Sequence, residues 1–171
     1  MNQTKLRIHT WPEKILKTSS REVAEVTDDI RSKLDEMVIL MGLNKGLGLA
    51  ANQAGLDLRL VVIEFEDKIF KLVNPKIVKS EGSIKITEGC LSFPDIDIEI
   101  KRFNKVWVEA LDETGQPLVI EADDILAVIF QHEIDHINGI PFIYRISFWQ
   151  KLKIIPKLNR VKKATKDALR K

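Results

Sequence analysis

The residues that point most directly to chemistry are His132, Glu133 and His136, which form an HExxH pattern. Residues four apart lie on one face of a helix, so the two imidazoles can reach the same metal ion. Two histidines need at least one more protein ligand, and Cys90, the single cysteine of the chain, is our candidate for it. A site of this composition with one open position is typical of catalytic metal centres, in which the glutamate of the motif acts as general base.

The same residues also have structural interpretations. Glu133 can lie on the surface, the two histidines can be satisfied by hydrogen bonds, and a lone cysteine is commonly a buried apolar side chain. The apolar residues 128–130 favour the metal, because they make this helix a core element in which buried polar side chains need partners. Cys90 precedes His132 by 42 residues, a separation that is by itself weak evidence for shared ligation.

Two segments with apolar periodicity predict helices in the body of the chain. Apolar residues at a spacing of three to four predict a helix over 21–41, with an internal start at Thr27 as the alternative. Asp123 or Asp124 can cap a second helix, which carries the HExxH pattern and runs to about Asn138. This second helix is apolar on nearly every side, as expected of a buried helix.

A basic helix is predicted at the C-terminus, over 148–171. Ser147, with Gln150 three residues later, resembles a capping box at its start, and Pro156 is expected to kink or split it. Residues 151–171 hold nine basic side chains and one acidic one, whereas the rest of the chain is net acidic. This asymmetry indicates an anionic partner or, alternatively, a solvated helix face.

Between the first two helices, alternating hydrophobicity predicts short strands. Asn74 and Pro75 are expected to end one of them, because proline cannot donate to the ladder. The expected strands cover residues 59–65, 68–73, 96–101, 106–110 and 117–121. The sequence therefore predicts an α+β fold in which antiparallel β-sheets pack around a buried central helix carrying HExxH, with an N-terminal helix and a C-terminal helix.

Length and composition fit one domain spanning 1–171, since 44% of the residues are hydrophobic and 30% are charged. A single cysteine excludes an intramolecular disulfide and fits a reducing compartment. Residues 1–10 contain no apolar signal core, and no run approaches the ~20 apolar residues of a membrane span. We therefore expect a cytoplasmic protein with no membrane partner; an organellar form without its transit peptide is the alternative.

Three segments of the chain together resemble the signature motifs of one family. Residues 46–53 read GLGLAANQ, 88–92 read EGCLS and 131–136 read QHEIDH. Taken alone, 46–53 is a plain small-residue loop or a close approach of backbone, and a poor nucleotide-binding loop because the third glycine of GxGxxG is absent. In this order and at this spacing, the three segments resemble the peptide deformylases over nearly the whole chain.

The resemblance implies a metal-dependent enzyme of protein biosynthesis that processes N-terminal methionine. It would release formate from N-formylmethionyl peptides, and Glu133 would take the proton of the attacking water. The side-chain amide of Gln53 and the backbone N–H of Leu91 would stabilise the oxyanion. One divalent ion is expected, Fe²⁺ in the cell, with Zn²⁺, Ni²⁺ or Co²⁺ able to replace it, and its ligands would be Cys90, His132 and His136.

The resemblance also implies how the substrate binds. Backbone groups of Gly48 and Gly89 would hold the peptide as an added strand, a mode that tolerates varied side chains. An apolar pocket would take the methionine, although each of its residues is also a plausible core residue. The pocket maps onto Leu47, Ile86, Ile125, Val128 and Ile129, with Glu88 and Gly89 nearby.

The sequence departs from the family pattern at one position near the site, and two other functions remain as alternatives to deformylation. Asp97 stands where many bacterial relatives carry an arginine that helps to hold the substrate backbone, which puts peptide affinity in question. A metallopeptidase of the HExxH type shares the general base, and a catalytically silent, ribosome-binding relative shares the fold. By family resemblance, the basic C-terminal helix is expected to contact ribosomal RNA, and no DNA partner is expected.

Overall fold

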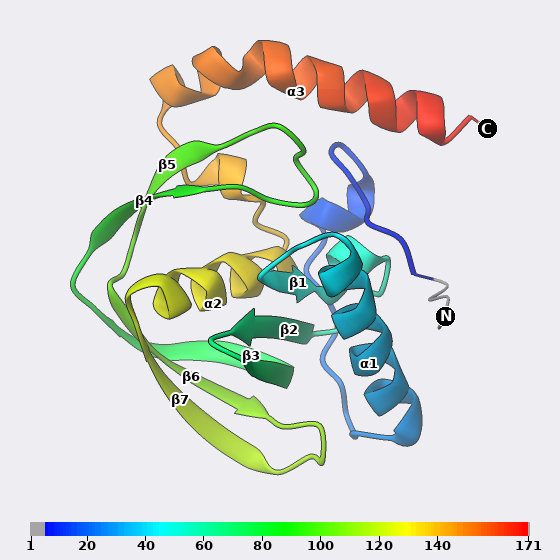
Figure 1. Cartoon of the computed structure of the whole chain (residues 1–171), viewed down its shortest axis with the longest axis vertical. Helices are drawn as coiled ribbons and strands as arrows, with labels where there is room; N and C mark the ends of the chain where they lie inside the picture. The colour runs from blue at the N-terminus through cyan, green and yellow to red at the C-terminus, as the bar shows by residue number, and fades with distance from the viewer. Residues whose placement is uncertain (1–5, 171) are drawn as a thin grey trace.

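The computed structural model describes residues 6–170 and has an α+β fold with two antiparallel sheets, as the sequence predicts (Figure 1). The larger sheet has five strands in the order β1-β2-β3-β6-β7, and β4 pairs with β5 in the smaller sheet. The strands are β1 (Gly48–Ala50), β2 (Leu60–Phe65), β3 (Lys68–Glu81), β4 (Ile84–Glu88), β5 (Ile98–Arg102), β6 (Lys105–Leu111) and β7 (Pro117–Asp123).

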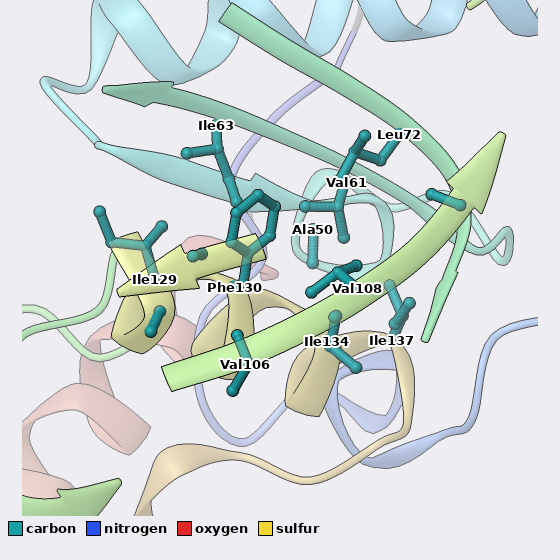
Figure 2. Close-up of a cluster of buried hydrophobic side chains, with 13 residues drawn as sticks. Ala50, Val61, Ile63, Leu72, Val106, Val108, Ile129, Phe130, Ile134 and Ile137 are labelled. Atoms are coloured by element: carbon teal, nitrogen blue, oxygen red, sulfur yellow. The ribbon is translucent and has the colours of Figure 1, made fainter. Parts of the chain in front are cut away.

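The helix α2 (Asp124–Ile137) lies at the centre, with the larger sheet on one side and the smaller sheet on the other (Figure 1). Its apolar side chains interdigitate with those of β2 and β6 in the main hydrophobic cluster (Figure 2). Burying one large aliphatic or aromatic side chain of this kind contributes about 1.5–3 kcal/mol. The labelled residues of the cluster include Val61, Ile63, Val106, Val108, Ile129, Phe130, Ile134 and Ile137.

The helix α1 (Asp28–Leu43) begins later than the apolar pattern suggests. The expected start at residue 21 is wrong, and the alternative start is right: the Thr27 hydroxyl accepts a hydrogen bond from the backbone N–H of Ile30. The segment before it is held in another way. The side-chain amide of Asn74 pairs with both the N–H and the carbonyl of Val23, so the backbone there does not need helical hydrogen bonds.

The strand β3 passes through Asn74 and Pro75, so the expected break at this step is also wrong. The pairing with β6 shifts register between Val73 and Lys76, and Asn74 has a positive φ of 53°. Pro75, which has no N–H to donate to the ladder, lies within this register shift. The strand then continues to Glu81.

The helix α3 (Phe148–Ala168) starts at the predicted capping box of Ser147 and Gln150 and lies across the smaller sheet (Figure 1). It is one helix, so the expected split at Pro156 does not occur. Pro156 cannot donate to the carbonyl of Leu152, and because this position is exposed, water can satisfy that carbonyl. Residue 171, the last residue of the predicted helix, lies outside the described residues.

Three short 3-10 helices complete the chain: η1 (Lys14–Lys17), η2 (Ala51–Ala54) and η3 (Phe142–Tyr144). The buried face of α3 packs on residues of β5 and η3 in a separate hydrophobic cluster. Within residues 6–170, no helix is both long and apolar enough to cross a membrane.

Replacing Pro156 with alanine should stabilise the protein. Proline in a helix interior costs about 3 kcal/mol relative to alanine, and the gain is reduced by about 1 kcal/mol because proline also restricts the unfolded chain. We expect Pro156→Ala to raise the free energy of unfolding by about 1–3 kcal/mol in urea titrations. Lys157→Ala, at the next exposed position, is the control and should change it little; an unchanged Pro156→Ala variant would contradict the argument.

Candidate metal centre and active site

Three potential metal ligands converge at the centre of the molecule. His132 and His136 lie one turn apart on α2, and their Nε2 atoms are 3.2 Å apart. The sulfur of Cys90, in the turn after β4, lies 3.2 Å from Nε2 of His136, and all three ligand atoms lie within 4.8 Å of one another. Ligands of a tetrahedral ion at about 2.1 Å lie roughly 3.4 Å apart. The three atoms therefore fit one ion.

The chemistry of this donor set also fits a catalytic metal. One thiolate and two imidazoles suit borderline cations such as Zn²⁺ or Fe²⁺. Three protein ligands leave a fourth position for water or substrate, whereas structural sites of this kind are closed by four. The structure thus brings together the three residues that the sequence singled out, and supports a single metal ion between them.

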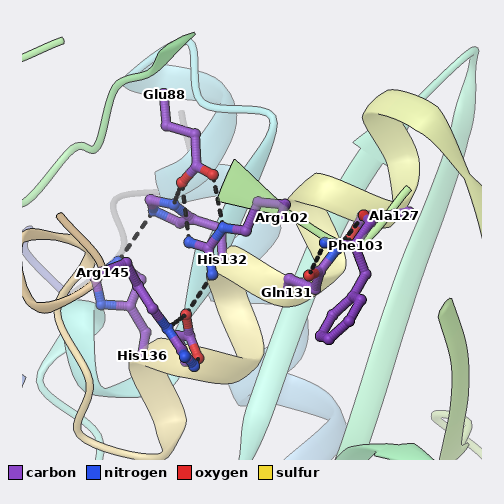
Figure 3. A network of polar contacts seen from close by, with 9 residues as sticks. Glu88, Arg102, Phe103, Ala127, Gln131, His132, His136 and Arg145 are labelled. Atoms are coloured by element: carbon purple, nitrogen blue, oxygen red, sulfur yellow. Dashed lines mark hydrogen bonds and ion pairs between the residues drawn. The ribbon is translucent and has the colours of Figure 1, made fainter. Parts of the chain in front are cut away.

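The orientation of His132 is fixed by Glu88. One carboxylate oxygen of Glu88 lies 2.7 Å from Nδ1 of His132, which leaves Nε2 free to face the ion. Arg102 donates to both oxygens of the same carboxylate, at 2.7 and 3.0 Å (Figure 3). Burial alone would raise the pKa of Glu88, but the hydrogen bonds from His132 and Arg102 outweigh it and lower the pKa to about 2. Glu88 therefore stays ionised beside the ligand.

Arg102 is itself buried and joins two acids. Its Nη1 bonds to Asp135, which lies on α2 between the two histidines, and Asp135 also accepts from Nε of Arg145 at 2.9 Å (Figure 3). The side chain of Arg102 is only 3% exposed, so its charge depends on these partners. The resulting network ties β5 and the turn after η3 to the helix that carries the ligands.

Sequence reasoning missed this network, although one signal for Arg102 was present. The strand β5 alternates between buried and exposed residues, and Arg102 falls on the buried face with Ile98 and Ile100. A charged residue on the apolar face of a strand indicates a buried ion pair. Asn52 was also missed as a positioning residue: its side-chain Nδ2 donates to the backbone carbonyl of His136.

Glu133 is buried against the glycine-rich segment. Its Oε2 is shielded from solvent and has no hydrogen-bond partner within residues 6–170. Burial raises the pKa of Glu133 to about 7, although the neighbouring His132 opposes the shift. A carboxyl group with such a pKa can both accept and return a proton near neutral pH.

Gly48 is required by this arrangement. A Cβ at residue 48 would lie 2.5 Å from Oε1 of Glu133, and 2.8 Å from its carboxyl carbon. No side chain can be accommodated there unless Glu133 moves. The first and third sequence motifs therefore meet through one contact.

Gln53 lies next to the ligand Cys90. Its Oε1 accepts from the backbone N–H of Ala50, which orients the amide so that Nε2 lies 3.4 Å from the sulfur of Cys90 and 3.2 Å from Oγ of Ser92. The side chain is buried. A donor is thus held beside the position of the ion by a bond to its own 3-10 turn, η2.

A cavity of about 410 Å³ opens onto these residues. The structure places every residue of the expected substrate site on its wall, together with His132, Glu133, Gln53, Cys90 and Leu91. Glu88 contributes to this wall, but its carboxylate is engaged by His132 and Arg102. The expected substrate residues on the wall are Leu47, Gly48, Ile86, Glu88, Gly89, Ile125, Val128 and Ile129.

The fold and the site define a metal-dependent hydrolase, with a three-ligand centre and a buried carboxylate at the end of an apolar cavity. The family model for polypeptide deformylase matches residues 5–152. The chain is 37% identical to the peptide deformylase of Aquifex aeolicus, over 91% of this chain and 96% of the relative. It is also 37% identical to that of Helicobacter pylori strain J99, over 94% and 97% respectively.

Solved structures agree with these relatives. A crystal structure of a plant peptide deformylase matches with a TM-score of 0.91 and 33% identity, over 98% of this chain and 95% of that chain. The enzyme of Legionella pneumophila matches with a TM-score of 0.87 and 35% identity, over 92% and 95%. The chain therefore belongs to the peptide deformylase family, and its activity is the metal-dependent removal of the N-formyl group from nascent peptides.

Replacing Gly48 with alanine should disable the site without unfolding the protein. The added Cβ would lie too close to the Glu133 carboxylate, so Glu133 must move away from its present position. A misplacement of about 1 Å can cost ~10²-fold in rate. We expect kcat/KM for formate release to fall about a hundredfold while metal content stays at one equivalent. Gly42→Ala, where nothing lies within 4 Å of the new Cβ, is the control. Full activity of Gly48→Ala would show that the contact has no role.

Proposed function

We propose that Cys90, His132 and His136 hold one divalent ion, at which Glu133 and Gln53 carry out the deformylation of N-formylmethionyl peptides. The convergence of one sulfur and two nitrogens within 4.8 Å of one another carries this proposal. When bound, the ion supplies a Lewis acid that makes water acidic enough to act as a nucleophile at about neutral pH. The remaining steps fall to the side chains around it.

Glu133 moves the proton. Its unpartnered Oε2 is the atom that accepts a proton from the attacking water, and the pKa of about 7 lets the same oxygen return the proton to the leaving amine. The carboxylate lies close to the backbone of Gly48, where there is no room for a Cβ. The absence of other hydrogen-bond partners for Oε2 within residues 6–170 supports this role, because a buried carboxylate oxygen needs one.

Gln53 and Leu91 stabilise the negative charge that develops on the formyl oxygen. The Nε2 of Gln53 lies beside the Cys90 sulfur, and the backbone N–H of Leu91 belongs to the residue that follows Cys90. Both residues line the cavity, and the amide of Gln53 is oriented in advance by its bond to the N–H of Ala50. One such donor is typically worth about 10²–10³ in kcat.

The substrate lies between the two sheets. Strand β1 is an edge of the larger sheet and β4 is an edge of the smaller one, so both offer main-chain groups to an extended peptide. Gly48 and Gly89 supply these groups next to the ion, and the methionine side chain enters the apolar cavity. Its walls there are formed by Leu47, Ile86, Ile125, Val128 and Ile129.

We propose Fe²⁺ as the ion in the cell, because the chain belongs to this family; Zn²⁺, Ni²⁺ and Co²⁺ suit the same ligands. A ferrous centre with a cysteine ligand is prone to oxidation, so elemental analysis of anaerobically prepared protein is the direct test. We further propose that residues 1–171 form one catalytic domain and that the enzyme works in the cytoplasm, where a lone free cysteine stays reduced.

Two substitutions separate the roles in the site. Glu133→Gln should keep the ion and lose about 10²–10⁴-fold in kcat/KM for formate release, because a general base contributes that much. Cys90→Ser should lose the ion itself, measured as metal content. Glu64→Gln, at an exposed position near the end of β2, is the matched control. Hydrolysis of internal amides by the native enzyme, without formate release, would instead favour a metallopeptidase.

We also propose that α3 contacts the ribosome through its basic residues. Its outer face is apolar near the start, where Phe148, Trp149 and Leu152 are exposed, and basic towards the end. The opposite face, with Ile154, Leu158 and Val161, packs against the body of the protein. A basic surface of this kind fits phosphate groups of ribosomal RNA.

Ribosome binding should then depend strongly on salt. Each phosphate contact that is lost reduces the slope of log affinity against log salt by about one. In co-sedimentation, the triple variant Lys162→Gln, Lys163→Gln, Lys166→Gln should bind more weakly and with a shallower slope than the native chain. The triple variant Lys68→Gln, Lys76→Gln, Lys85→Gln carries the same charge change on the strands and is the control. Binding that is absent or insensitive to salt would remove this proposal.

A further inference from the structure

An unpaired carboxylate stands next to Gly89, a residue of the cavity wall. Asp97 lies just before β5, is exposed, and has no ion pair or hydrogen bond to any residue within 6–170. It is close to the wall all the same: a Cβ built on Gly89 would lie 2.8 Å from Oδ1 of Asp97. Gly89 lines the cavity and directly precedes Cys90. The carboxylate therefore lies directly beside Gly89, along which the proposed peptide strand would run.

Asp95, in the same loop, is also exposed and unpaired within residues 6–170, but no atom of it lies within 4 Å of the Cβ position of Gly89. The remaining acids of this region are engaged or lie elsewhere. Glu88 is bound by His132 and Arg102, and Glu99 lies 3.8 Å from the amino group of Lys85. Glu133 is buried behind the position of the ion. The charge of Asp97 is thus left for a partner that the folded chain does not supply.

We infer that Asp97 is a specificity residue, which favours formylated peptides with lysine or arginine within the first three residues after the methionine. The inference rests on the proposed function of the site. A peptide added beside Gly89 extends by about 3.3 Å per residue, so its early side chains lie near Gly89 and Asp97. An exposed ion pair is worth a modest amount, which corresponds to a preference of about two- to fivefold over a neutral residue.

The effect belongs to binding and not to chemistry. Asp97 touches neither the ligands nor Glu133, so the pair with a substrate cation is the same before and during the reaction. Such uniform binding changes KM and leaves kcat unaltered. Because both charges are exposed to solvent, added salt weakens the preference.

The test compares peptides that differ only in charge. Formyl-Met tetrapeptide amides with lysine, glutamine or glutamate at the first, second or third position after methionine are assayed by formate release, at low and high salt. The native enzyme should prefer lysine over glutamate, through KM, at one or more positions. Asp97→Asn should abolish the preference for lysine over glutamate, and Asp97→Lys should reverse it. Asp95→Asn removes the same charge from the same loop and should leave the preference in place.

Two outcomes would overturn the inference: an equal lysine-to-glutamate ratio for native enzyme and Asp97→Asn at all three positions, or an equal loss of preference in Asp95→Asn. The neutral glutamine peptides distinguish a failure of the role of Asp97 from a failure of the proposed function. If the metal-loaded native enzyme does not deformylate the neutral peptides, the function itself fails. If it processes them normally and shows no charge preference, only the role of Asp97 fails.

Discussion

The burial of α2 from Ala127 to its end is the constraint on which the rest of the structure depends. A helix between two sheets cannot expose its polar side chains to water, so each must find a partner inside the protein. His132 finds Glu88, Asp135 finds Arg102 and Arg145, and Gln131 pairs with the backbone of Phe103. Among the groups that remain, His132 and Glu133 line the cavity, and Nε2 of His136 lies 3.2 Å from Nε2 of His132. The same packing that stabilises the core thus leaves a small set of groups aimed at one point.

Much of the architecture was predictable because it follows from local periodicity. The central helix, the capping box at Ser147 and most strands appear where the patterns place them. Two of the errors, at the start of α1 and at Asn74–Pro75, involve the same residue, whose side chain hydrogen-bonds to a backbone segment far from it in sequence. The side chain of Asn74 bonds to the backbone of Val23, which lies before the start of α1. The same residue takes a positive φ where β3 passes Pro75.

The candidate site divides in a similar way. The residues that meet at the cavity were recognisable from three short motifs, because their types and order are constrained by the chemistry. The groups that orient them were not, since Arg102 and Arg145 come from other elements and no spacing along the chain relates them to His132. Only the three-dimensional packing brings β5 and the turn after η3 against α2 (Figure 3). Arg102 was nevertheless detectable as a charge on an apolar strand face.

The placement of Arg102 between Glu88 and Asp135 has a consequence for cooperativity. One guanidinium pairs with an acid on β4 and with an acid on α2, so neither element can detach without breaking a buried ion pair. Breaking a buried pair in this way costs about 3–5 kcal/mol. Local opening around the catalytic centre is therefore suppressed, and the amide protons of α2 should exchange with solvent only when the whole molecule unfolds.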